Sequence, residues 1–440
     1  MVIKAKACVT KYTNRNMIMN SNDDEVPVIW LKNRHANTQA GRAAVNHLLP
    51  DGITDEARSF HSQLPGYEMT PLKRLSQLAA RLGLGSIWVK DESARMRLNA
   101  FKALGGSFAI YRFICEKVGH SKLSFEDLMS DEIRKVVGDI TFTSATDGNH
   151  GKGLAWAARK LNFPCVIYVH KNTSQARIAA IAEYGAEVRV VDGNYDDAVR
   201  QCERDARVNG WQVISDTSWP GYEDVPMWVM QGYTTLLAET QEQFAAQGII
   251  KPTHIFLQAG VGAFAAAMIA FYEKLFGAEA PISVVVEPRE AACLYHSLAM
   301  DDGRPHSISG DLNTIMAGLA CGEPSPIAWE IIKDCADFIV TAPDYVAAKG
   351  MRMYGVPLKG DPFVISGESG AVTLGVLPFI MGYKGAAEFK EQLQLNENSR
   401  VLLINTEGNT DPDYFRNVVW EGVFPVPKAY RWHPEMDYGG

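Results

Sequence analysis

The chain has 440 residues, about three times the commonest domain size, so we expect two domains. Hydrophobic residues make up 47% of it and charged residues 21%, which is the balance of a globular protein and excludes a disordered, collagenous or disulfide-built chain. The formal net charge is -8, from 43 basic and 51 acidic residues, and no basic run interrupts the sequence. We therefore expect a small-molecule partner and no nucleic acid.

The seven cysteines sit singly, without a CxxC pair, so the sequence predicts neither a metal site nor a disulfide framework. The first 20 residues contain no apolar segment of the kind found in secretory signals. Both features favour a cytoplasmic protein. Residues 256–272 carry no charge, but Gln258, Gly260 and Gly262 interrupt them. We therefore expect a strand, a glycine turn and a buried helix there, and no membrane span.

From residue 85 onward, short β-branched and apolar runs alternate with longer segments of helical periodicity. The predicted strands cover residues 87–90, 140–143, 165–169, 187–191, 254–257, 283–287, 337–341 and 400–405. The predicted helices between the earlier strands cover residues 102–118, 153–161, 175–185 and 195–210. Nearly unbroken apolar strands that alternate with helices are typical of parallel sheets covered on both faces.

These elements predict an α/β fold with two interleaved, open, twisted parallel-sheet domains. Because no low-complexity linker divides the chain, we expect a small α/β domain, residues 118–232, inserted in a large one formed by residues 1–117 and 233–440. Residues 1–56 form a polar segment without a recognisable motif. In such folds the functional groups lie on turns that leave the carboxyl ends of the strands.

The first such turn, residues 99–107, reads NAFKALGGS. Lys102 stands at the start of a predicted helix, where the helix dipole disfavours a cation, and two glycines that weaken the helix follow it. These departures from local rules favour a lysine kept for reactivity, as a Schiff-base amine, over a solvated surface lysine.

The second turn, residues 143–151, reads TSATDGNHG and offers more polar side chains than a simple turn needs. Asp147 or Asn149 could serve only as a helix cap. His150 is interpreted as a hydrogen-bonded helix residue, because no second histidine stands at metal-ligand spacing.

The third turn, Gly260-Val261-Gly262-Ala263-Phe264-Ala265, follows a strand and opens a helix. Glycines there allow main-chain N–H groups to converge on an anion. The turn also half-matches the dinucleotide fingerprint, with Glu287 ending the next strand where a ribose-binding acid is expected. A third interpretation is tight packing without a ligand. Two later turns, residues 366–370 and 405–410, are also rich in small and polar residues, which suits a ligand, close packing or turn capping.

Together, these turns resemble the pyridoxal-phosphate enzymes of the tryptophan synthase β / serine-threonine dehydratase superfamily, in which the reactive lysine, an S-x-G-N-H turn, a glycine loop and a late Ser or Thr follow in this order. The resemblance runs from Thr70 to the C-terminus. Within the superfamily, the sequence is most similar to the diaminopropionate ammonia-lyases, through motifs that include NAFKALGGS, TDGNHG, DTSWPGY, FLQAGVGA, IMAGLACGEPSP, SGESGAV and NTEGNTDP.

The resemblance implies pyridoxal 5'-phosphate as cofactor and a role for each turn. Lys102 would form the Schiff base with the cofactor, and Asn149 would hydrogen-bond its phenolic oxygen. The loop Gly260, Val261, Gly262, Ala263 and Phe264 would hold the phosphate through main-chain N–H groups. Thr406 would face the pyridine nitrogen and, being neutral, would leave that nitrogen unprotonated.

Two acids distinguish this sequence from the hydroxy-amino-acid dehydratases. Asp147 precedes Gly148-Asn149, where the superfamily usually has a small residue, and Asp216 follows the run VIS. 2,3-Diaminopropionate differs from serine by an amine that can carry positive charge, so acids near its β-carbon would select it. Asp147 would also accept a proton on the face opposite Lys102, so that both stereoisomers become substrates. A helix cap at Asp147 and a turn at Asp216 are the alternatives.

The expected activity is therefore a carbon–nitrogen lyase reaction that converts 2,3-diaminopropionate to pyruvate and ammonia. The alternatives are a serine or threonine dehydratase with the same apparatus, an NAD-binding Rossmann oxidoreductase and a non-catalytic binding protein. The resemblance and the frequency of symmetric enzymes both imply a homodimer.

Overall fold

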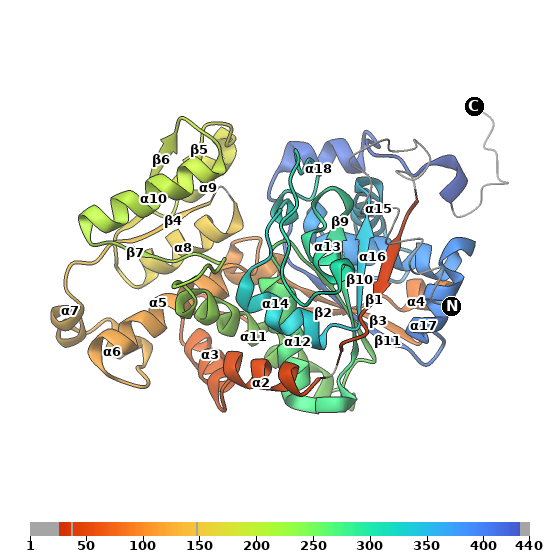
Figure 1. Cartoon of the computed structure of the whole chain (residues 1–440), viewed down its shortest axis with the longest axis horizontal. Helices are drawn as coiled ribbons and strands as arrows, with labels where there is room; N and C mark the ends of the chain where they lie inside the picture. The colour runs from red at the N-terminus through yellow and green to blue at the C-terminus, as the bar shows by residue number, and fades with distance from the viewer. Residues whose placement is uncertain (1–25, 37, 147, 432–440) are drawn as a thin grey trace.

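The computed structural model describes residues 26–36, 38–146 and 148–431, which form two β-sheets at opposite ends of the molecule's long axis (Figure 1). The strands are β1 (Ile29–Lys32), β2 (Leu72–Arg74), β3 (Ser86–Asp91), β4 (Phe142–Ala145), β5 (Cys165–His170), β6 (Glu187–Val191), β7 (Gln212–Val213), β8 (His254–Gln258), β9 (Ile282–Pro288), β10 (Phe338–Ala342) and β11 (Arg400–Asn405). One sheet has the order β1-β10-β9-β8-β11-β3-β2 and the other the order β6-β5-β4-β7.

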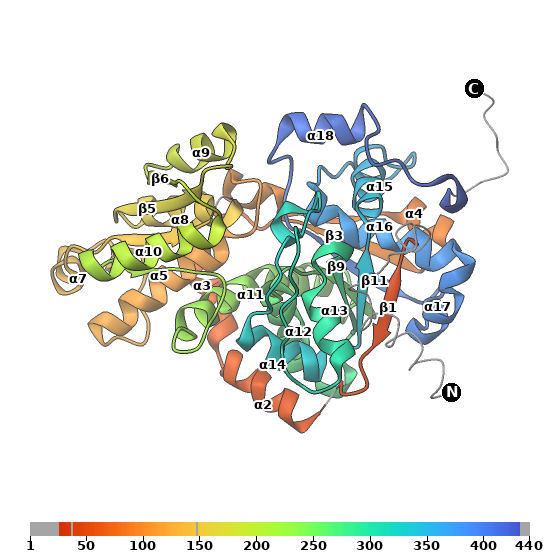
Figure 2. The ribbon, with the colours of Figure 1, turned by 45° about the horizontal axis from the view of Figure 1, so that its top comes forward.

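The helices cover both sheets. They are α2 (Gln39–Leu48), α3 (Ile53–Ser62), α4 (Ser76–Leu82), α5 (Ala103–Val118), α6 (Phe125–Leu128), α7 (Asp131–Val137), α8 (Asn149–Lys160), α9 (Gln175–Ala182), α10 (Tyr195–Asn209), α11 (Asp224–Ala245), α12 (Ala263–Phe276), α13 (Cys293–Met300), α14 (Pro326–Cys335), α15 (Asp344–Gly355), α16 (Glu368–Gly382), α17 (Ala387–Leu393) and α18 (Pro412–Val419). In Figures 1 and 2, helix α11 lies between the two sheets.

The predicted α/β fold with two parallel-dominated sheets is confirmed. The predicted strands are present, although the strand predicted at 140–143 is β4, two residues later. Its pairing with β5 begins at Phe142, because the partner strand starts only after Pro164, which has no N–H to donate. Two short strands at the edges of the larger sheet were not predicted. Both are antiparallel: β1 pairs with β10, and β2 with β3.

The apolar runs of the larger sheet are buried on both faces, as parallel strands require. Alternate residues of each strand enter opposite cores: Ile255 and Leu257 join one hydrophobic cluster, and Phe256 joins the other. The side chains of Leu402 and Leu403 in β11 divide in the same way. This double burial explains why the strands read as unbroken apolar sequence rather than as an alternating pattern.

The segment before residue 56 supplies an edge strand and a helix to the larger unit. Strand β1 pairs with β10, and α2 packs against α12 and α14. All four strands of the smaller sheet fall within residues 118–232, the range predicted for the inserted domain. These boundaries stay a prediction: residue 118 is the last of α5, whereas residue 232 falls inside α11.

The uncharged segment 256–272 forms the end of β8 and most of α12, separated by the turn 259–262. Within the described part of the chain, no helix is long and apolar enough to cross a membrane.

A cluster of charges is sealed between β3, the turn that follows it and α11. The Lys90 amine lies 2.7 Å from Glu239 Oε2, and the Arg95 guanidinium lies 2.7 Å from Glu239 Oε1. Arg95 also pairs with Glu92 at 2.8 Å, and all four side chains are fully buried. Burial would raise the pKa of Glu239, but its hydrogen bonds and charge pairing with Arg95 and Lys90 hold this pKa at about 2.

We predict that Glu239→Ala destabilises the protein by about 3–5 kcal/mol, because it leaves Lys90 and Arg95 buried without their shared carboxylate. Glu242→Ala is the matched control on the same helix, since Glu242 pairs with Arg58 at the surface and its loss should cost less than about 1 kcal/mol. Denaturant unfolding of both variants measures the difference. Equal losses would show that the buried cluster contributes no more than a surface pair.

Candidate active site

The predicted site residues lie on turns that leave the carboxyl ends of strands of both sheets. Asn149 begins α8 after β4, and Asp216 follows β7 in the smaller sheet. The glycine loop joins β8 to α12 in the larger sheet, and Thr406 follows β11. Lys102 immediately precedes α5. The predicted helix at 102–118 is thus confirmed to within one residue.

Lys102 makes the central contact of the site. Its amine donates to Asp216 Oδ2 at 2.6 Å, and the two side chains are 24% and 23% exposed. The rings of Phe101 and Tyr233 lie 5.4 and 5.6 Å from the same amine. The structure therefore brings Lys102 and Asp216 together, 114 residues apart in sequence.

The electrostatics of this pair favour two charges. Burial by itself lowers the pKa of Lys102, but the charge of Asp216 and the nearby Tyr233 hydroxyl outweigh burial and hold this pKa above its usual range. Burial would raise the pKa of Asp216, yet the charges of Lys102 and His150 hold it well below its usual range. The pair is therefore a lysine cation and a carboxylate anion.

The two glycines after Lys102 have a packing function. A Cβ on Gly105 would lie 2.5 Å from the Tyr233 ring, and one on Gly106 would contact the backbone of α8. On the facing helix, a Cβ at Gly153 would meet the backbone of Ala103 at 2.8 Å. The three glycines let α5, α8 and α11 approach closely, which seats Lys102 at the junction of these helices.

The loop before Lys102 is tied to the end of β11. Met96, Arg97 and Asn99 have positive φ angles of 49°, 61° and 58°, a conformation that costs energy outside glycine. Asn99 O accepts from Gly408 N at 2.8 Å, and Phe101 N donates to Thr406 O at 3.2 Å. These main-chain bonds fix the Lys102 loop against the turn that carries Thr406.

The glycine loop is a tight turn at the N-terminus of α12. Gly262 has φ +98°, and a Cβ there would lie 2.8 Å from Ile332 Cδ1. A Cβ on Gly260 would lie 3.0 Å from Cys321 Sγ. In the described ranges, no protein acceptor contacts the N–H groups of Gly262, Ala263 and Phe264, which are first-turn donors that a 14-residue helix leaves free.

The turn after β11 contributes two buried polar residues. Thr406 Oγ1 lies 2.7 Å from Gln258 Nε2 at the end of β8. Glu407 Oε2 accepts from Asn149 Nδ2 at 2.7 Å, so this bond joins the turns of the two sheets. Glu407 Oε1 accepts from Ser369 N at 3.2 Å, at the start of α16.

Glu407 and its neighbour Glu368 resist ionisation. Burial raises the pKa of Glu368 to about 8, and the charge of Glu407 acts in the same direction. Burial also raises the pKa of Glu407, against the lowering effect of the Asn149 hydrogen bond. Neither acid was predicted as a site residue, although Glu368 and Glu407 stand in the two later polar turns, residues 366–370 and 405–410.

The second polar turn is only partly described, because Asp147 lies outside the described residues. His150 is buried, and its Nε2 lies 2.9 Å from Ile214 O, while its Nδ1 lies 3.9 Å from Asp216 Oδ2. This hydrogen-bonded helix position is the one predicted for His150. The same position brings the other ring nitrogen of His150, Nδ1, close to the carboxylate of Asp216.

Glu287 does not play the ribose-binding part that a dinucleotide site requires. Its carboxylate accepts from Leu294 N at 2.9 Å and from Tyr295 N at 2.7 Å, which caps α13. Burial raises the pKa of Glu287 to about 8, against these two bonds. Glu287 is therefore not available as the ribose-binding acid that the dinucleotide interpretation of the glycine turn requires.

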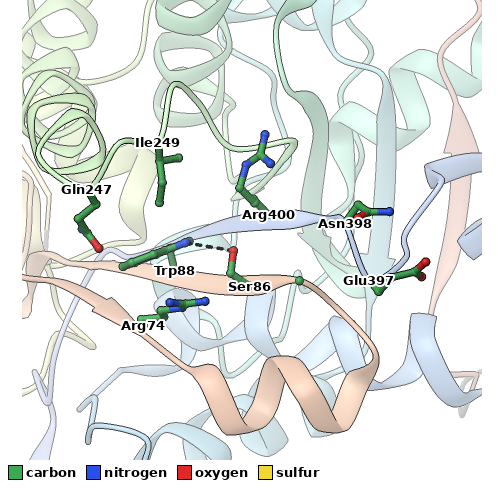
Figure 3. A pocket seen from close by; sticks show the side chains of 9 residues that line it. Arg74, Ser86, Trp88, Gln247, Ile249, Glu397, Asn398 and Arg400 are labelled. Carbon is green, nitrogen blue, oxygen red and sulfur yellow. Dashed lines mark hydrogen bonds between the residues drawn. The ribbon is translucent and has the colours of Figure 1, made fainter.

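A depression of about 370 Å³ lies at the opposite edge of the larger sheet (Figure 3). Ser86 and Arg400, the first residues of β3 and β11, line it together with Trp88 and Arg74. The Arg74 guanidinium lies 5.3 Å from the Trp88 ring, and Trp88 Nε1 donates to Ser86 Oγ at 3.2 Å. Because it lies at the amino ends of the strands, this depression is separate from the Lys102 site.

Comparisons with known proteins agree on one family. Residues 64–407 match the family described as pyridoxal-phosphate dependent enzyme. The chain is 47% identical over 385 residues to a diaminopropionate ammonia-lyase of Salmonella typhimurium, covering 87% of this chain and 95% of that one. It is also 47% identical over 371 residues to the diaminopropionate ammonia-lyase of Escherichia coli, covering 84% and 92%.

Solved structures give the same result. The selenomethionine holo form of the Escherichia coli diaminopropionate ammonia-lyase superposes with a TM-score of 0.83 at 42% identity, over 92% of this chain and 99% of that one. Its complex with an aminoacrylate-PLP azomethine intermediate gives 0.81 at 43% identity, over 91% and 99%. A threonine deaminase of Solanum lycopersicum, 20% identical with a TM-score of 0.67 over 89% and 97%, shares the fold. The chain belongs to the family of pyridoxal-phosphate dependent enzymes.

Proposed function

We propose that the protein is a carbon–nitrogen lyase that eliminates ammonia from 2,3-diaminopropionate and yields pyruvate and a second ammonia, with pyridoxal 5'-phosphate as cofactor. The observation that carries the proposal is the Lys102–Asp216 pair. The preceding residue, Phe101, contacts the Phe264 ring of the glycine loop at 4.8 Å and donates its N–H to Thr406 O. Asn149 is joined to the same turn through Glu407. The 47% identity to diaminopropionate ammonia-lyases over nearly their whole length supports the substrate.

The residues present fit this cofactor. The glycine loop presents first-turn N–H groups without a protein acceptor in the described part of the chain, which suits a phosphate. Lys102 supplies an amine for the cofactor's aldehyde, Asn149 an amide for its phenolic oxygen and Thr406 a hydroxyl for its ring nitrogen. When bound, the cofactor condenses with amines and withdraws electrons from the α-carbon of an amino acid.

Lys102 is the group placed to move protons, and Asp216 orients it. The Lys102 amine must lose a proton before it can act as a nucleophile or base, and its hydrogen bond to Asp216 Oδ2 at 2.6 Å fixes the direction in which the amine points. Asp216 carries a negative charge at neutral pH because its pKa is strongly lowered. It can therefore also attract the second, cationic amine of the substrate.

Asp147 is the second acid of the proposal. In sequence it stands between Thr146 and Gly148, two residues before Asn149, the residue that we propose supplies the amide for the cofactor. We propose that Asp147 accepts the α-proton from one stereoisomer while Lys102 accepts it from the other. The enzyme would then use both D- and L-diaminopropionate.

The alternatives have weaker support. A probable D-serine dehydratase of Oenococcus oeni is 27% identical over 341 residues, and a threonine dehydratase of Haemophilus influenzae is 30% identical over only 55% of this chain. The oxidoreductase alternative is wrong, because the chain belongs to the pyridoxal-phosphate family. The same family membership disfavours a non-catalytic binding protein, since Lys102 is present and paired in the site.

We also propose a homodimer in the cytoplasm. Exposed apolar side chains support self-association: Val356 is 71% exposed, Phe363 65% and Trp420 71%. Their segments lie close together, because Arg352 donates to the main chain of Phe424 and Val364 N donates to Tyr354 O. The native mass in solution tests the dimer, and cell fractionation tests the compartment. A monomer at working concentration would overturn the first.

We predict that Lys102→Ala keeps the fold but lowers turnover by at least about 10²–10⁴-fold, because the variant lacks the amine that attaches the cofactor and moves the proton. Borohydride treatment followed by peptide mass spectrometry should fix the cofactor to Lys102 in the parent and to no lysine in the variant. If borohydride fixes the cofactor to another lysine, that lysine and not Lys102 carries the reactive amine.

We predict that Gly262→Asp weakens cofactor affinity more than about tenfold, because a carboxylate repels the phosphate and a side chain strains a residue at φ +98°. Gly262→Ala is the control that adds the strain without the charge, and it should weaken affinity less. Equilibrium dialysis with the cofactor measures both. If Gly262→Asp binds the cofactor as tightly as the parent protein, the loop has only a packing role.

We predict that Asp147→Asn retains the cofactor but slows elimination from 2,3-diaminopropionate, with D-diaminopropionate affected by about 10²–10⁴-fold and the L-isomer less. The near-isosteric amide can still cap a helix but cannot accept the proton. Steady-state kinetics on both isomers and on serine, parent against variant, make the comparison. Unchanged rates on both isomers would leave Asp147 only a cap, and a parent that prefers serine would overturn the substrate.

A further inference from the structure

We propose that Gln258 sets the direction of the Thr406 hydroxyl bond and so keeps the cofactor's ring nitrogen unprotonated. Gln258 is thereby a positioning residue, which acts through Thr406. The inference rests on the proposed function, because it takes Thr406 as the residue that faces the ring nitrogen.

The hydrogen-bond partners of Gln258 determine which way its amide points. The terminal amide atom nearest to the turn lies 3.0 Å from Ile404 O and 2.7 Å from Thr406 Oγ1. Ile404 O is a carbonyl and can only accept, so the atom facing it must be the NH₂ nitrogen. The reversed amide would set two acceptor oxygens 3.0 Å apart with no proton between them.

This orientation determines whether the Thr406 hydroxyl donates or accepts in its hydrogen bond with Gln258. Both N–H groups of Gln258 Nε2 are used, one by Ile404 O and one by Thr406 Oγ1. A hydroxyl that accepts from Gln258 cannot donate to it at the same time. The proton of the Thr406 hydroxyl therefore points to another acceptor.

Burial and backbone contacts limit the conformations that Thr406 can adopt. Thr406 is 5% exposed and Gln258 is 2% exposed. The Thr406 carbonyl accepts from Phe101 N, and a Cβ on Gly370 would lie 3.2 Å from Thr406 N. The backbone of Thr406 is therefore bonded at its carbonyl and closely packed at its N–H, and the hydrogen bond from Gln258 fixes the direction of the hydroxyl.

The arrangement leaves one buried acceptor without a partner. Gln258 Oε1 has no hydrogen-bond partner among the described residues, which costs stability. An amide kept in place despite this cost suits a role in orientation. A hydroxyl that donates to a pyridine nitrogen requires the lone pair on that nitrogen, and an unprotonated ring withdraws electrons more weakly.

The decisive variant is Gln258→Glu, which replaces the Nε2 donor by a carboxyl oxygen. Burial and the facing Ile404 carbonyl favour the protonated form of a carboxyl group at this place, so the variant is measured across a pH range. Once this group is ionised, its oxygen can only accept, so the Thr406 hydroxyl would donate to it. The hydroxyl would then turn its lone pairs toward the ring nitrogen, which favours a proton on that nitrogen. With cofactor labelled at that atom, the ¹⁵N resonance should move upfield to the position of a protonated pyridine, whereas the parent stays unprotonated.

Two further variants separate the hydroxyl from a direct charge effect and from misfolding. In Gln258→Glu combined with Thr406→Val, the ¹⁵N resonance should equal that of Thr406→Val alone, because the effect passes through the hydroxyl. Gln258→Met introduces no buried charge and leaves the hydroxyl free to turn. Its ring nitrogen should become protonated as the pH falls through a range in which the parent does not change.

Each result bears on one proposal at a time. The role of Gln258 is overturned if the ¹⁵N resonance is unshifted in folded, cofactor-loaded Gln258→Glu and Gln258→Met. If the parent protein is active on diaminopropionate, the proposed function still stands in that case. An upfield shift that persists in the double variant would assign the effect to charge and also overturn the inference. A parent that fixes no cofactor on Lys102 would instead overturn the proposed function.

Discussion

The ion pair between Lys102 and Asp216 is the contact on which the site depends, because each residue belongs to a different part of the fold. Asp216 follows β7 of the smaller sheet, and Lys102 is held by main-chain bonds to the turn after β11 of the larger one. The Asn149–Glu407 hydrogen bond makes a second connection of the same kind. The two sheets therefore meet at the turns that we propose form the active site, and any shift between the sheets changes the distances within these two residue pairs.

Two lysines of this protein show how surroundings decide between structure and reactivity. Lys90 is fully buried and donates to Thr70 O, Glu239 and Gln243, so its three N–H groups are all used. Lys102 is 24% exposed and carries one short ion pair, to Asp216. Breaking the Lys90 contacts would leave buried charges unpaired. Lys102, in contrast, can exchange one partner for another. The lysine that we propose for the chemistry is the one with fewer hydrogen-bond partners among the described residues.

The predictable part of the fold is the part governed by burial. Strands such as β8 and β11 were found because both their faces enter hydrophobic cores, whereas β1 and β2, with 4 and 3 residues at the edges, carry too little pattern to be recognised. The site was predictable where a residue type breaks a local rule, as Lys102 does. In sequence, Gln258 is noticeable only as an interruption of an apolar run, and Glu407 only as one member of a polar turn. Their partners become visible only in the contacts between β8, the turn after β11 and α8.

The glycine loop shows why a motif needs its neighbours before it indicates a ligand. A turn that opens a helix after a strand suits any phosphate, and Gly260 to Ala265 alone left a dinucleotide open. In the folded chain, Glu287 is fully occupied as the cap of α13, so the ribose contact that a dinucleotide requires is missing. Cys321 lies against the loop, since a Cβ on Gly260 would come within 3.0 Å of its Sγ, and burial raises the pKa of this thiol. The loop also contacts the residue before Lys102, because the rings of Phe264 and Phe101 lie 4.8 Å apart. The phosphate site that we propose therefore lies close to the amine that we propose for the aldehyde.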